Sequence, residues 1–599
     1  MTAERFEEED EFETGYSGRV VRRLLVYMKP YTLLLTVVLV IVVVAALLQT
    51  VGPFIVKDAV DNQIQAGRTD RLGMLVLVYL GTLIGVFVLF FIQAVMITYV
   101  SQRVMMDMRL ELFTHVQKMS IAFFDRNPVG RLVTRMTNDV ATIEQVLQQG
   151  VIEALYDVLV LVAIVGAMFI LDWRLAIAMM IFVPGLVYFV RMFAVALRDT
   201  FRAQRVWLAR LNAFLNENIT GMAVIQLFNR QKHNLDRFDE RNRGYLRWNL
   251  RATMYFAAFE PTVVMFNAVT TAAIIWYGGG RVVHDALTLG TLIAFLQYMQ
   301  RFFWPVRELS ERLTNMQEAL ASCERIFNVL DQPEEIVDEA SALGLGEVEG
   351  RVEFDHVWFA YDGENWVLRD VSFEIAPGEA VAIVGATGAG KSTMMNLLNR
   401  FYDVQRGEIR VDGQPIKALR QRELRREVGM VLQDPFIFTD SVLENVRMRD
   451  ASISDDEVVT AAQQVGAEAF IERMPQGYAS HLAERGANLS TGQKQLISLA
   501  RVAAFNPRIV LVMDEATASI DPETEATLQR SMREVMAGRT AIVIAHRLNT
   551  IRHVDRILVL NQGQVVEEGS HAELLAMSGI YARLYELQYK DQDISVERR

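Results

Sequence analysis

The sequence predicts a helical membrane domain with six transmembrane helices and long cytoplasmic extensions, followed by a soluble α/β domain. Two observations carry this prediction. The chain has 599 residues, 52% of them hydrophobic, and its long apolar runs all lie before about Ser310. A chain of this length exceeds one ordinary domain. After that point, short continuous apolar runs typical of buried parallel strands lead into a glycine-rich loop and into a pair of acidic residues.

Six stretches approach the 20 or so apolar residues that a membrane-spanning helix requires. They are residues 31–56, 72–100, 151–171, 175–190, 256–277 and 287–304. The third and fourth are separated only by Asp172, Trp173 and Arg174, which predicts a very short turn. The last two are expected to be joined by a loop containing Gly278, Gly279 and Gly280.

Long segments rich in helix formers separate the second span from the third and the fourth from the fifth. These predict helices that continue past the membrane surface into water. Basic residues precede the first span and are frequent in both long loops, which places the loops and both termini in the cytoplasm by the positive-inside rule. The chain is therefore predicted to be a multi-pass protein of the inner (cytoplasmic) membrane. The basic residues are Arg19, Arg22, Arg23, Lys29, Arg103, Arg109, Arg126, Arg131, Arg135, Arg191, Arg198, Arg202, Arg205 and Arg210, against Arg68, Arg71 and Arg281 outside.

Three carboxylates, Glu153, Asp157 and Glu260, lie inside or beside predicted spans. Such groups are expensive in a bilayer, so they face a cavity or a partner. Glu260 precedes Pro261, which removes a backbone donor. It either lines a substrate path or pairs structurally, and the sequence leaves both open.

Composition and local pattern define the remaining segments. The whole chain has a net charge of −12, which argues against a function in nucleic-acid binding, because proteins that bind nucleic acid need a basic face. Residues 18–31 interleave apolar and basic side chains, which favours an interfacial amphipathic helix; the start of the first span is the alternative. The predicted organisation is a disordered acidic tail (1–17), a transmembrane domain (18–325), a linker (326–348), a nucleotide-binding domain (349–590) and a C-terminal tail (591–599).

Residues 385–393 read GATGAGKST, directly after the strand-type run 380–384. This is the P-loop pattern GxxxxGK[ST] in its strand-to-helix context, and it predicts ATP binding through inward-pointing amides. Lys391 is expected to reach the β and γ phosphates, and Ser392 to bind Mg²⁺. The expected nucleotide contacts in this loop are Gly385, Thr387, Gly388, Ala389, Gly390, Lys391, Ser392 and Thr393.

The continuous apolar run 509–513 ends in Asp514 and Glu515. A carboxylate at the tip of such a strand lies beside a P-loop. Asp514 is therefore expected to hold the Mg²⁺ shell and Glu515 to polarise the attacking water. Two surface acids after a core strand are the alternative.

Those two motifs indicate only a P-loop nucleotide hydrolase, and a further motif narrows the prediction. Residues 489–493 read LSTGQ, just before the strand, and resemble the signature of ABC transporter ATPases. Other segments are similar to family motifs: Tyr361 to the aromatic residue that stacks on adenine, Gln433 to the Q-loop, and His546 to the switch histidine. Residues 484–486 resemble the X-loop and 519–521 the D-loop. The resemblance implies catalytic roles for Glu515, His546 and Gln433, a Mg²⁺ contact for Gln433, and nucleotide contacts for Tyr361, Ser490, Gly492, Gln493 and Asp521.

The membrane half extends the resemblance over nearly the whole chain. Phe123, Phe124 and Asp125, with residues 130–131 and 138–139, are similar to the first intracellular loop of multidrug and lipid exporters. In that family, a bend near Phe124 and another at 218–228 dock on the ATPase domains as coupling helices. The signature of one subunit also closes over ATP held by the other, so the resemblance implies a second half-transporter as partner.

Thr491 departs from the glycine that the family prefers in the signature. A β-branched residue tolerates positive φ poorly, so close approach of this backbone to phosphate is expected to suffer. With Asp514, Glu515 and His546 intact, the chain resembles the catalytically competent subunit of bacterial heterodimeric exporters. We expect a different partner chain, with an intact signature and without the catalytic glutamate. A homodimer that tolerates threonine is the alternative.

The resemblance implies ATP-driven export of hydrophobic drugs, lipids or peptides by alternating access. A dedicated lipid or glycolipid flippase is an alternative within the class. A membrane regulator that binds ATP without transport is an alternative from another class, and Glu515 and His546 disfavour it because a pure sensor needs no hydrolytic base.

Overall fold

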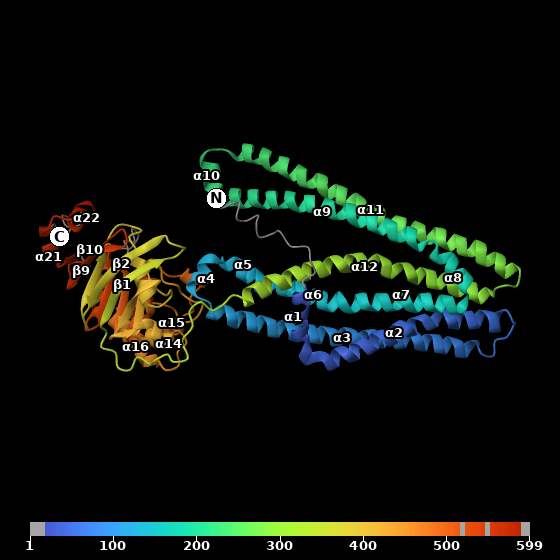
Figure 1. Cartoon of the computed structure of the whole chain (residues 1–599), viewed down its shortest axis with the longest axis horizontal. Helices are drawn as coiled ribbons and strands as arrows, with labels where there is room; N and C mark the ends of the chain where they lie inside the picture. The colour runs from blue at the N-terminus through green and yellow to red at the C-terminus, as the bar shows by residue number, and fades with distance from the viewer. Residues whose placement is uncertain (1–17, 515–521, 546–550, 589–599) are drawn as a thin grey trace. The chain divides into compact units, whose positions relative to one another are not determined.

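The structure is a computed structural model that describes residues 18–514, 522–545 and 551–588. The chain divides into two compact units (Figure 1). The first comprises residues 18–117 and 129–332, and the second residues 118–128 with the chain from 333 onward. The predicted tails 1–17 and 591–599 lie outside the described residues.

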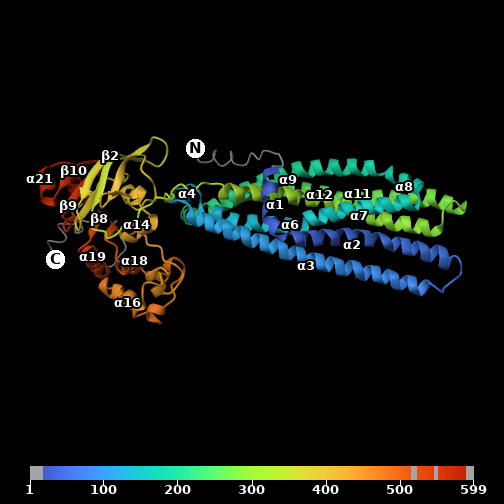
Figure 2. The same ribbon diagram turned by 60° about the horizontal axis from the view of Figure 1, so that its bottom comes forward.

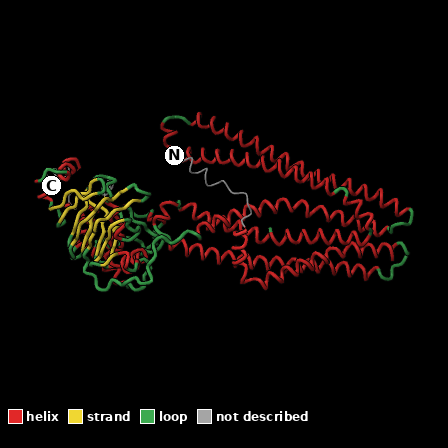
Figure 3. The backbone as a smooth tube through the Cα atoms, viewed as in Figure 1, coloured by secondary structure: helices red, strands yellow, loops and turns green. Residues whose placement is uncertain are grey.

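The first unit is entirely helical (Figure 3). Its helices are α1 (Gly18–Met28), α2 (Thr32–Ala59), α3 (Leu72–Lys118, which ends one residue into the second unit), α5 (Val129–Thr134), α6 (Val140–Gln149), α7 (Val151–Leu171), α8 (Trp173–Met180), α9 (Val183–Thr220), α10 (Met222–Leu227), α11 (Gln231–Val283) and α12 (Leu289–Leu330). Two π-helical segments, Val60–Ile64 and Arg135–Asp139, extend α2 and precede α6.

Within the described residues, five helical stretches are long and apolar enough to cross a membrane: Gly18–Ile64, Leu72–Lys118, Val129–Leu171, Trp173–Thr220 and Gln231–Val283. They contain the first five predicted spans. The sixth, 287–304, lies in α12, where Gln297, Gln300 and Arg301 lower the hydropathy. Because α12 packs against α2, α7 and α11, its polar groups find protein partners. Arg301 donates to the carbonyl of Gln49 and Tyr298 to that of Thr50.

The predicted glycine loop between the last two spans is wrong. Gly278, Gly279 and Gly280 are helical and belong to α11, which ends at Val283. Gly278 lies where the helix packs closely, since a Cβ there would meet Leu292 at 2.8 Å. Tight packing at Gly278 therefore favours the helix in spite of the weak helix propensity of glycine, while Gly279 and Gly280 have open space around them.

The predicted short turn after α7 consists of Asp172 alone. Its carboxylate caps α8 by accepting bonds from the amides of Arg174 and Leu175, at 3.0 and 2.9 Å. It also pairs with Arg281 at 2.8 Å. Arg281 is one of the basic residues predicted on the outer side, so its charge is compensated there.

The two carboxylates predicted in the third span share one cation. Arg312 of α12 lies 2.5 Å from Glu153 and 3.1 Å from Asp157, both on α7. Asp157 is buried. The pairing makes these two carboxylates a structural link between α7 and α12, whereas Glu260 is exposed on α11 beside Pro261.

The long helices extend far beyond a bilayer. At 1.5 Å per residue, the 47 residues of α3 span about 70 Å, more than twice the roughly 30 Å hydrocarbon core. Helices α9 and α11 lie side by side, with α10 at their turn (Figures 1 and 2). Because helices continue well past any membrane surface, the predicted extensions are present.

The second unit begins with α4 (Ile121–Arg126) and continues after residue 333 as an α/β domain. Its strands are β1 (Val352–Ala360), β2 (Trp366–Ile375), β3 (Ala380–Val384), β4 (Arg406–Val411), β5 (Gln414–Pro415), β6 (Val428–Val431), β7 (Ile509–Asp514), β8 (Thr540–Ala545), β9 (Arg556–Asn561) and β10 (Gln564–Gly569). Its further helices are α13 (Lys391–Leu398), α14 (Gln421–Glu427), α15 (Val442–Arg447), α16 (Asp455–Gln464), α17 (Glu468–Ile471), α18 (Thr491–Phe505), α19 (Pro522–Met536), α21 (His571–Ala576) and α22 (Ile580–Gln588).

Two sheets organise the second unit. One is antiparallel in the order β2-β1-β4-β5, and the other has the order β10-β9-β3-β8-β7-β6, parallel from β9 to β6. The inner parallel strands are buried on both faces, which explains their continuous apolar sequences. The predicted fold class, a helical membrane domain followed by an α/β ATPase domain, is confirmed.

Candidate nucleotide site

The predicted phosphate-binding loop lies between β3 and α13, at the carboxyl edge of the six-stranded sheet. Gly388 and Gly390 have φ of 82° and 105°, in the left-handed region that favours glycine. A Cβ at Gly390 would also meet Leu368 at 2.6 Å. The loop therefore has the tight conformation in which successive amides face inward, directly before a helix N-terminus.

Lys391 is the first residue of α13 and is buried. Its ammonium group donates to the carbonyl oxygens of Gly385 and Ala386, at 2.7 and 3.0 Å. The cation thus lies over the loop in which phosphate is expected. Ser392, predicted to bind Mg²⁺, is exposed at the start of the same helix.

Tyr361, the predicted adenine platform, follows β1 and is half exposed. Its hydroxyl donates to the Thr393 hydroxyl at 3.1 Å, which brings the ring to the P-loop helix. The rings of Phe359 and Tyr402 meet it edge to face, with centroids at 4.8 and 5.1 Å. The structure therefore places Tyr361 beside the helix that follows the P-loop.

Sheet register places the end of β7 at the same edge. Ile383 of β3 pairs with Ile544 of β8, and Met513 of β7 pairs with the same residue. Hence β3, β8 and β7 end at the same level of the sheet. Asp514 is the last residue of β7, which lies two strands away from β3, a distance of about 10 Å across the sheet. Glu515 and His546 come next in sequence after β7 and β8, and with Asp521 they lie outside the described residues.

Gln433 follows β6, which pairs in parallel with β7 at the far side of the same edge. It is exposed, and its carbonyl accepts a bond from the Gln495 side chain at 3.4 Å. Arg501 of α18 donates to the carbonyls of Phe436 and Asn445, both at 2.7 Å. Burial lowers the pKa of Arg501 to about 10, so it remains cationic at neutral pH. The helix of the signature and the segment after Gln433 are thereby linked.

The signature residues form the N-terminus of α18. Ser490 caps the helix: its hydroxyl accepts from the Gln493 amide at 3.3 Å, while the Gln493 side chain accepts from the Ser490 amide at 2.9 Å. Ser490 and Thr491 are exposed, and Gly492 is buried. The capped terminus presents Ser490 and Thr491 to solvent, in an arrangement suited to meeting an anion.

The predicted backbone strain at Thr491 is absent. Thr491 is the first helical residue of α18, and it is not among the non-glycine residues with positive φ. Threonine is compatible with this helical conformation. Any effect of the substitution must therefore come from the side chain itself, which adds bulk at the helix terminus.

The sequence did not predict a role for Tyr402 or Glu335. The Tyr402 hydroxyl donates to Asp125 of α4, and Glu335 accepts a hydrogen bond from the Ser120 hydroxyl at 2.7 Å. Tyr402 and Glu335 therefore bind the predicted first coupling segment. Tyr402 follows α13 in an ordinary-looking aromatic segment. No periodicity or motif signals such a contact, since it depends on packing between segments some 280 residues apart.

The chain matches two family models, one for the ABC transporter transmembrane region over residues 35–306 and one for the ABC transporter over residues 368–518. It is 38% identical over 583 residues to the ABC transporter ATP-binding protein YknV of Bacillus subtilis, covering 96% of each chain. The chain belongs to the ABC transporter family.

Other comparisons cover the length of this ABC transporter chain. It is 34% identical over 586 residues to the ATP-dependent lipid A-core flippase of Syntrophus aciditrophicus, covering 98% of this chain and 97% of that protein. The fold is similar to the structure of a bacterial Atm1-family ABC exporter with ATP bound, with a TM-score of 0.76 and 27% identity over 93% of this chain and 99% of that one. Membrane and ATPase domains are therefore fused in the order found in exporters, and the chain is an integral membrane protein.

Proposed function

We propose that this ABC transporter chain is one half of a dimeric exporter that uses ATP hydrolysis to move hydrophobic or amphipathic substrates out of the cytoplasm by alternating access. One observation carries the proposal: a helical membrane unit and a P-loop whose lysine is in place occur in a single chain. Each half of such a dimer would carry both a nucleotide-binding domain and membrane helices.

The proposed chemistry follows from the edge of the sheet. The P-loop amides and Lys391 would hold the phosphates, and Tyr361 would stack on the adenine. Ser392, Asp514 and Gln433 would share a Mg²⁺ that keeps phosphate oxygens and water as its other ligands, as that ion prefers. Glu515 and His546 would act on the attacking water and on the γ-phosphate.

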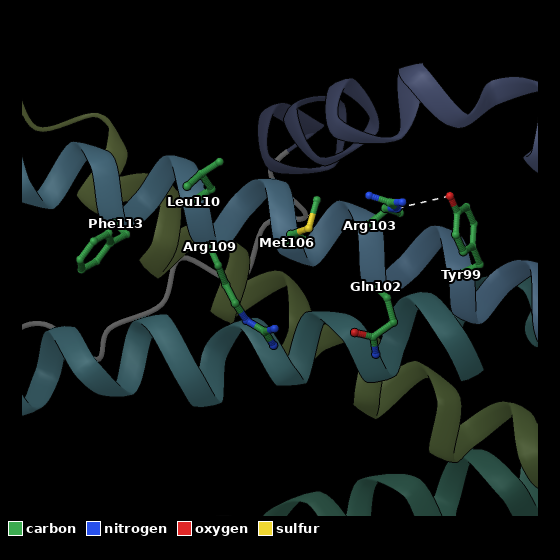
Figure 4. Close-up of a pocket in the computed structure, with 7 residues that line it drawn as sticks. All are labelled: Tyr99, Gln102, Arg103, Met106, Arg109, Leu110 and Phe113. Carbon is green, nitrogen blue, oxygen red and sulfur yellow. Dashed lines mark hydrogen bonds between the residues drawn. The ribbon is translucent and has the colours of Figure 1, made fainter.

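An exposed stripe on α3 supports a second subunit. Tyr99, Met106, Leu110 and Phe113 share one face of the helix with Arg103, and they line an open groove of about 700 Å³ beside α6 (Figure 4). Met106, Leu110 and Phe113 follow the predicted span 72–100, and Met106 lies 34 residues after the start of α3, about 50 Å along the helix and thus beyond the hydrocarbon core. Lipid cannot cover this stripe in water, so a protein surface fits it best.

The second predicted coupling segment also supports a partner. Ile219, Val224, Leu227 and Phe228 at α10 are each more than half exposed, at the turn of the α9–α11 hairpin. The exposed N-terminus of α18 also supports a partner, because its signature residues would cover ATP that is bound to the P-loop of a second subunit.

We further propose that the partner is a different chain, with a glycine in its signature and without the catalytic glutamate. In such a pair, Thr491 weakens only the nucleotide site that is formed by the P-loop of the partner and the signature of this chain. A homodimer is the alternative.

We propose that the protein lies in the inner membrane. Both termini and the α10 turn would face the cytoplasm, because basic residues are concentrated on that side. We propose domain boundaries at residues 18–325 and 349–590, with the linker between them. The helix α12 continues to Leu330, and the two compact units divide after Gln332.

Glu515→Gln tests the exporter proposal. The full-length chain, with its partner if one is required, is reconstituted in vesicles. Turnover of ATP and uptake of a fluorescent hydrophobic cation are measured. The variant should lose turnover and accumulate closed, ATP-bound dimers, with loss of uptake. An ATP-gated regulator would show unchanged signalling and no uptake even in the wild type, which would contradict the proposal.

A lipid or glycolipid flippase is the second candidate, and it is favoured by the 34% identity to a lipid A-core flippase. The two candidates differ in what stimulates ATP turnover. A flippase should respond to a labelled glycolipid and translocate it, with little response to soluble hydrophobic dyes, whereas a multidrug exporter should respond to several unrelated dyes.

A further inference from the structure

Helix α4 is attached to the ATPase unit by three side-chain contacts. Tyr402 donates to Asp125, and Glu335 of the linker accepts from Ser120 and pairs with Arg126. A weaker pair joins Lys118 and Glu334 at 3.6 Å. Three of these four contacts end on the linker, and among the contacts of the described residues the one from Tyr402 reaches the nucleotide-binding domain proper.

Tyr402 is in contact with the proposed adenine platform as well as with α4. Its ring meets the ring of Tyr361 edge to face at 5.1 Å and that of Phe359 at 5.6 Å. Tyr361 in turn donates to Thr393 of the P-loop helix at 3.1 Å. A single side chain therefore touches both Tyr361, on which adenine is expected to stack, and α4.

The backbone around Tyr402 is firmly held. Arg400 is only 2% exposed, and it donates to the carbonyl of Leu419 at 3.1 Å and to the carboxylate of Asp403 at 3.2 Å. It also reaches Asp338 of the linker at 3.4 Å. Because the residues on both sides of Tyr402 are fixed, a displacement of its ring must pass to Asp125 instead of being absorbed by the local backbone.

The hydroxyl of Tyr402 remains a donor at physiological pH. Burial and the hydrogen bond to Asp125 both raise the pKa of Tyr402. A neutral hydroxyl that donates to a carboxylate is a strong contact, worth more than a bond between neutral groups.

We propose that Tyr402 is a positioning residue that relays occupancy of the adenine site to α4. This inference rests on the proposed function. When adenine stacks on Tyr361, the edge-to-face contact between that ring and Tyr402 changes. The shift passes through the Tyr402 hydroxyl to Asp125. A ligand changes a conformational equilibrium only through contacts that differ between the two states, and this edge contact is such a contact.

Tyr402→Phe tests the relay, because it removes only the hydroxyl. Tyr478→Phe is the matched control: in the described part of the chain its hydroxyl is buried without a hydrogen-bond partner. With the full-length transporter in vesicles, Tyr402→Phe should keep basal ATP turnover and the KM for ATP within about twofold. Substrate stimulation and substrate moved per ATP should fall about tenfold, as the loss of a hydrogen bond to a charged group implies. Tyr478→Phe should change neither.

A double variant and a structural readout separate relay from simple docking. Asp125→Asn should reproduce the loss, and Tyr402→Phe with Asp125→Asn should lose no more than either alone. In the wild type, amide hydrogen exchange at residues 121–126 should change on adding MgATP, and in Tyr402→Phe it should not. Unchanged coupling in Tyr402→Phe, losses that multiply in the double variant, or an intact exchange response would each overturn the relay. A wild type that neither hydrolyses ATP nor exports would refute the proposed function instead.

Discussion

The ammonium group of Lys391 lies 2.7 Å from the carbonyl oxygen of Gly385, at the start of its own phosphate-binding loop. The lysine is the first residue of the helix that follows, and it also contacts Ala386 at 3.0 Å. Nucleotide must therefore exchange these carbonyl contacts for phosphate oxygens. Because a phosphate is charged and a carbonyl is not, the exchange favours the bound state.

Lys391→Met should abolish the response to nucleotide without unfolding the domain. The methionine keeps the aliphatic stem and removes the cation that binds phosphate. The wild type should unfold several degrees higher in saturating MgATP, as expected when ligand binds only the native state. The variant should show no such shift in differential scanning fluorimetry. Lys417→Met, at an exposed lysine of the same domain, is the control, and a full shift in Lys391→Met would contradict the site.

Thr491→Gly distinguishes the two proposed assemblies. Since the backbone at this position is helical, glycine is tolerated there, and its effect should come from removing the side chain. In a homodimer both sites would gain, and about 1 kcal/mol corresponds to about fivefold in turnover. In the proposed heterodimer only the inactive site changes, so ATP turnover should stay within about twofold. Thr491→Ala controls for helix propensity, and a fivefold rise in Thr491→Gly would favour the homodimer.

Gly244→Ala should destabilise the α9–α11 hairpin. A Cβ at Gly244 of α11 would lie 2.8 Å or less from three ring carbons of Trp207 on α9, far inside contact distance. Overpacking of this kind costs about 1–3 kcal/mol. The midpoint of thermal unfolding in detergent should fall. Gly280→Ala, at an exposed helical glycine with open space around it, should leave the midpoint unchanged or raise it. Equal effects of the two changes would contradict this packing.

Asp139→Asn should weaken the attachment of α12 to the segment before α6. Arg325 binds Asp139 with two nitrogens, at 2.6 and 3.1 Å, and the carboxylate is buried. Hydrogen bonds to charged groups contribute about 1.5–3 kcal/mol. The variant should therefore unfold at a lower temperature. Asp239→Asn removes an exposed carboxylate paired with Arg243, and should have almost no effect because exposed pairs contribute little.

The docking of α4 through Glu335 should not depend on pH near neutrality. The Ser120 hydroxyl, with Arg126, lowers the pKa of Glu335. A depressed carboxyl pKa adds stability above the unfolded value of about 4.3, and that stability is lost as pH falls through the folded value. Rate-corrected hydrogen exchange at residues 120–126 should be constant from pH 8 to 5.5 and faster only below about pH 4. Glu335→Gln should exchange faster already at pH 7. A change in the wild type between pH 8 and 6 would contradict this assignment.

Local sequence patterns identified most of the fold. The strand before the P-loop, the helix after it and the strand before Asp514 appear where predicted, because each depends on short-range chemistry: glycine conformation and buried parallel strands. The glycine run 278–280 predicted a loop between the last two spans, but these residues are helical, and packing of Gly278 against Leu175 and Leu292 offsets its low helix propensity. The apolar pattern predicted the sixth span, but only the structure explains its polar residues, because α12 packs against other helices that supply their hydrogen-bond partners.

By itself, the sequence determined the class of the protein and predicted the residues of its nucleotide site, because spans of about 20 apolar residues and a phosphate-binding loop are encoded within short windows. Only the tertiary structure decided which distant groups meet: Arg312 with Glu153 and Asp157, and Tyr402 with Tyr361 and Asp125. Such meetings depend on how separate helices and strands pack. Packing is set by the summed burial of many side chains, and no single window of the chain contains that sum.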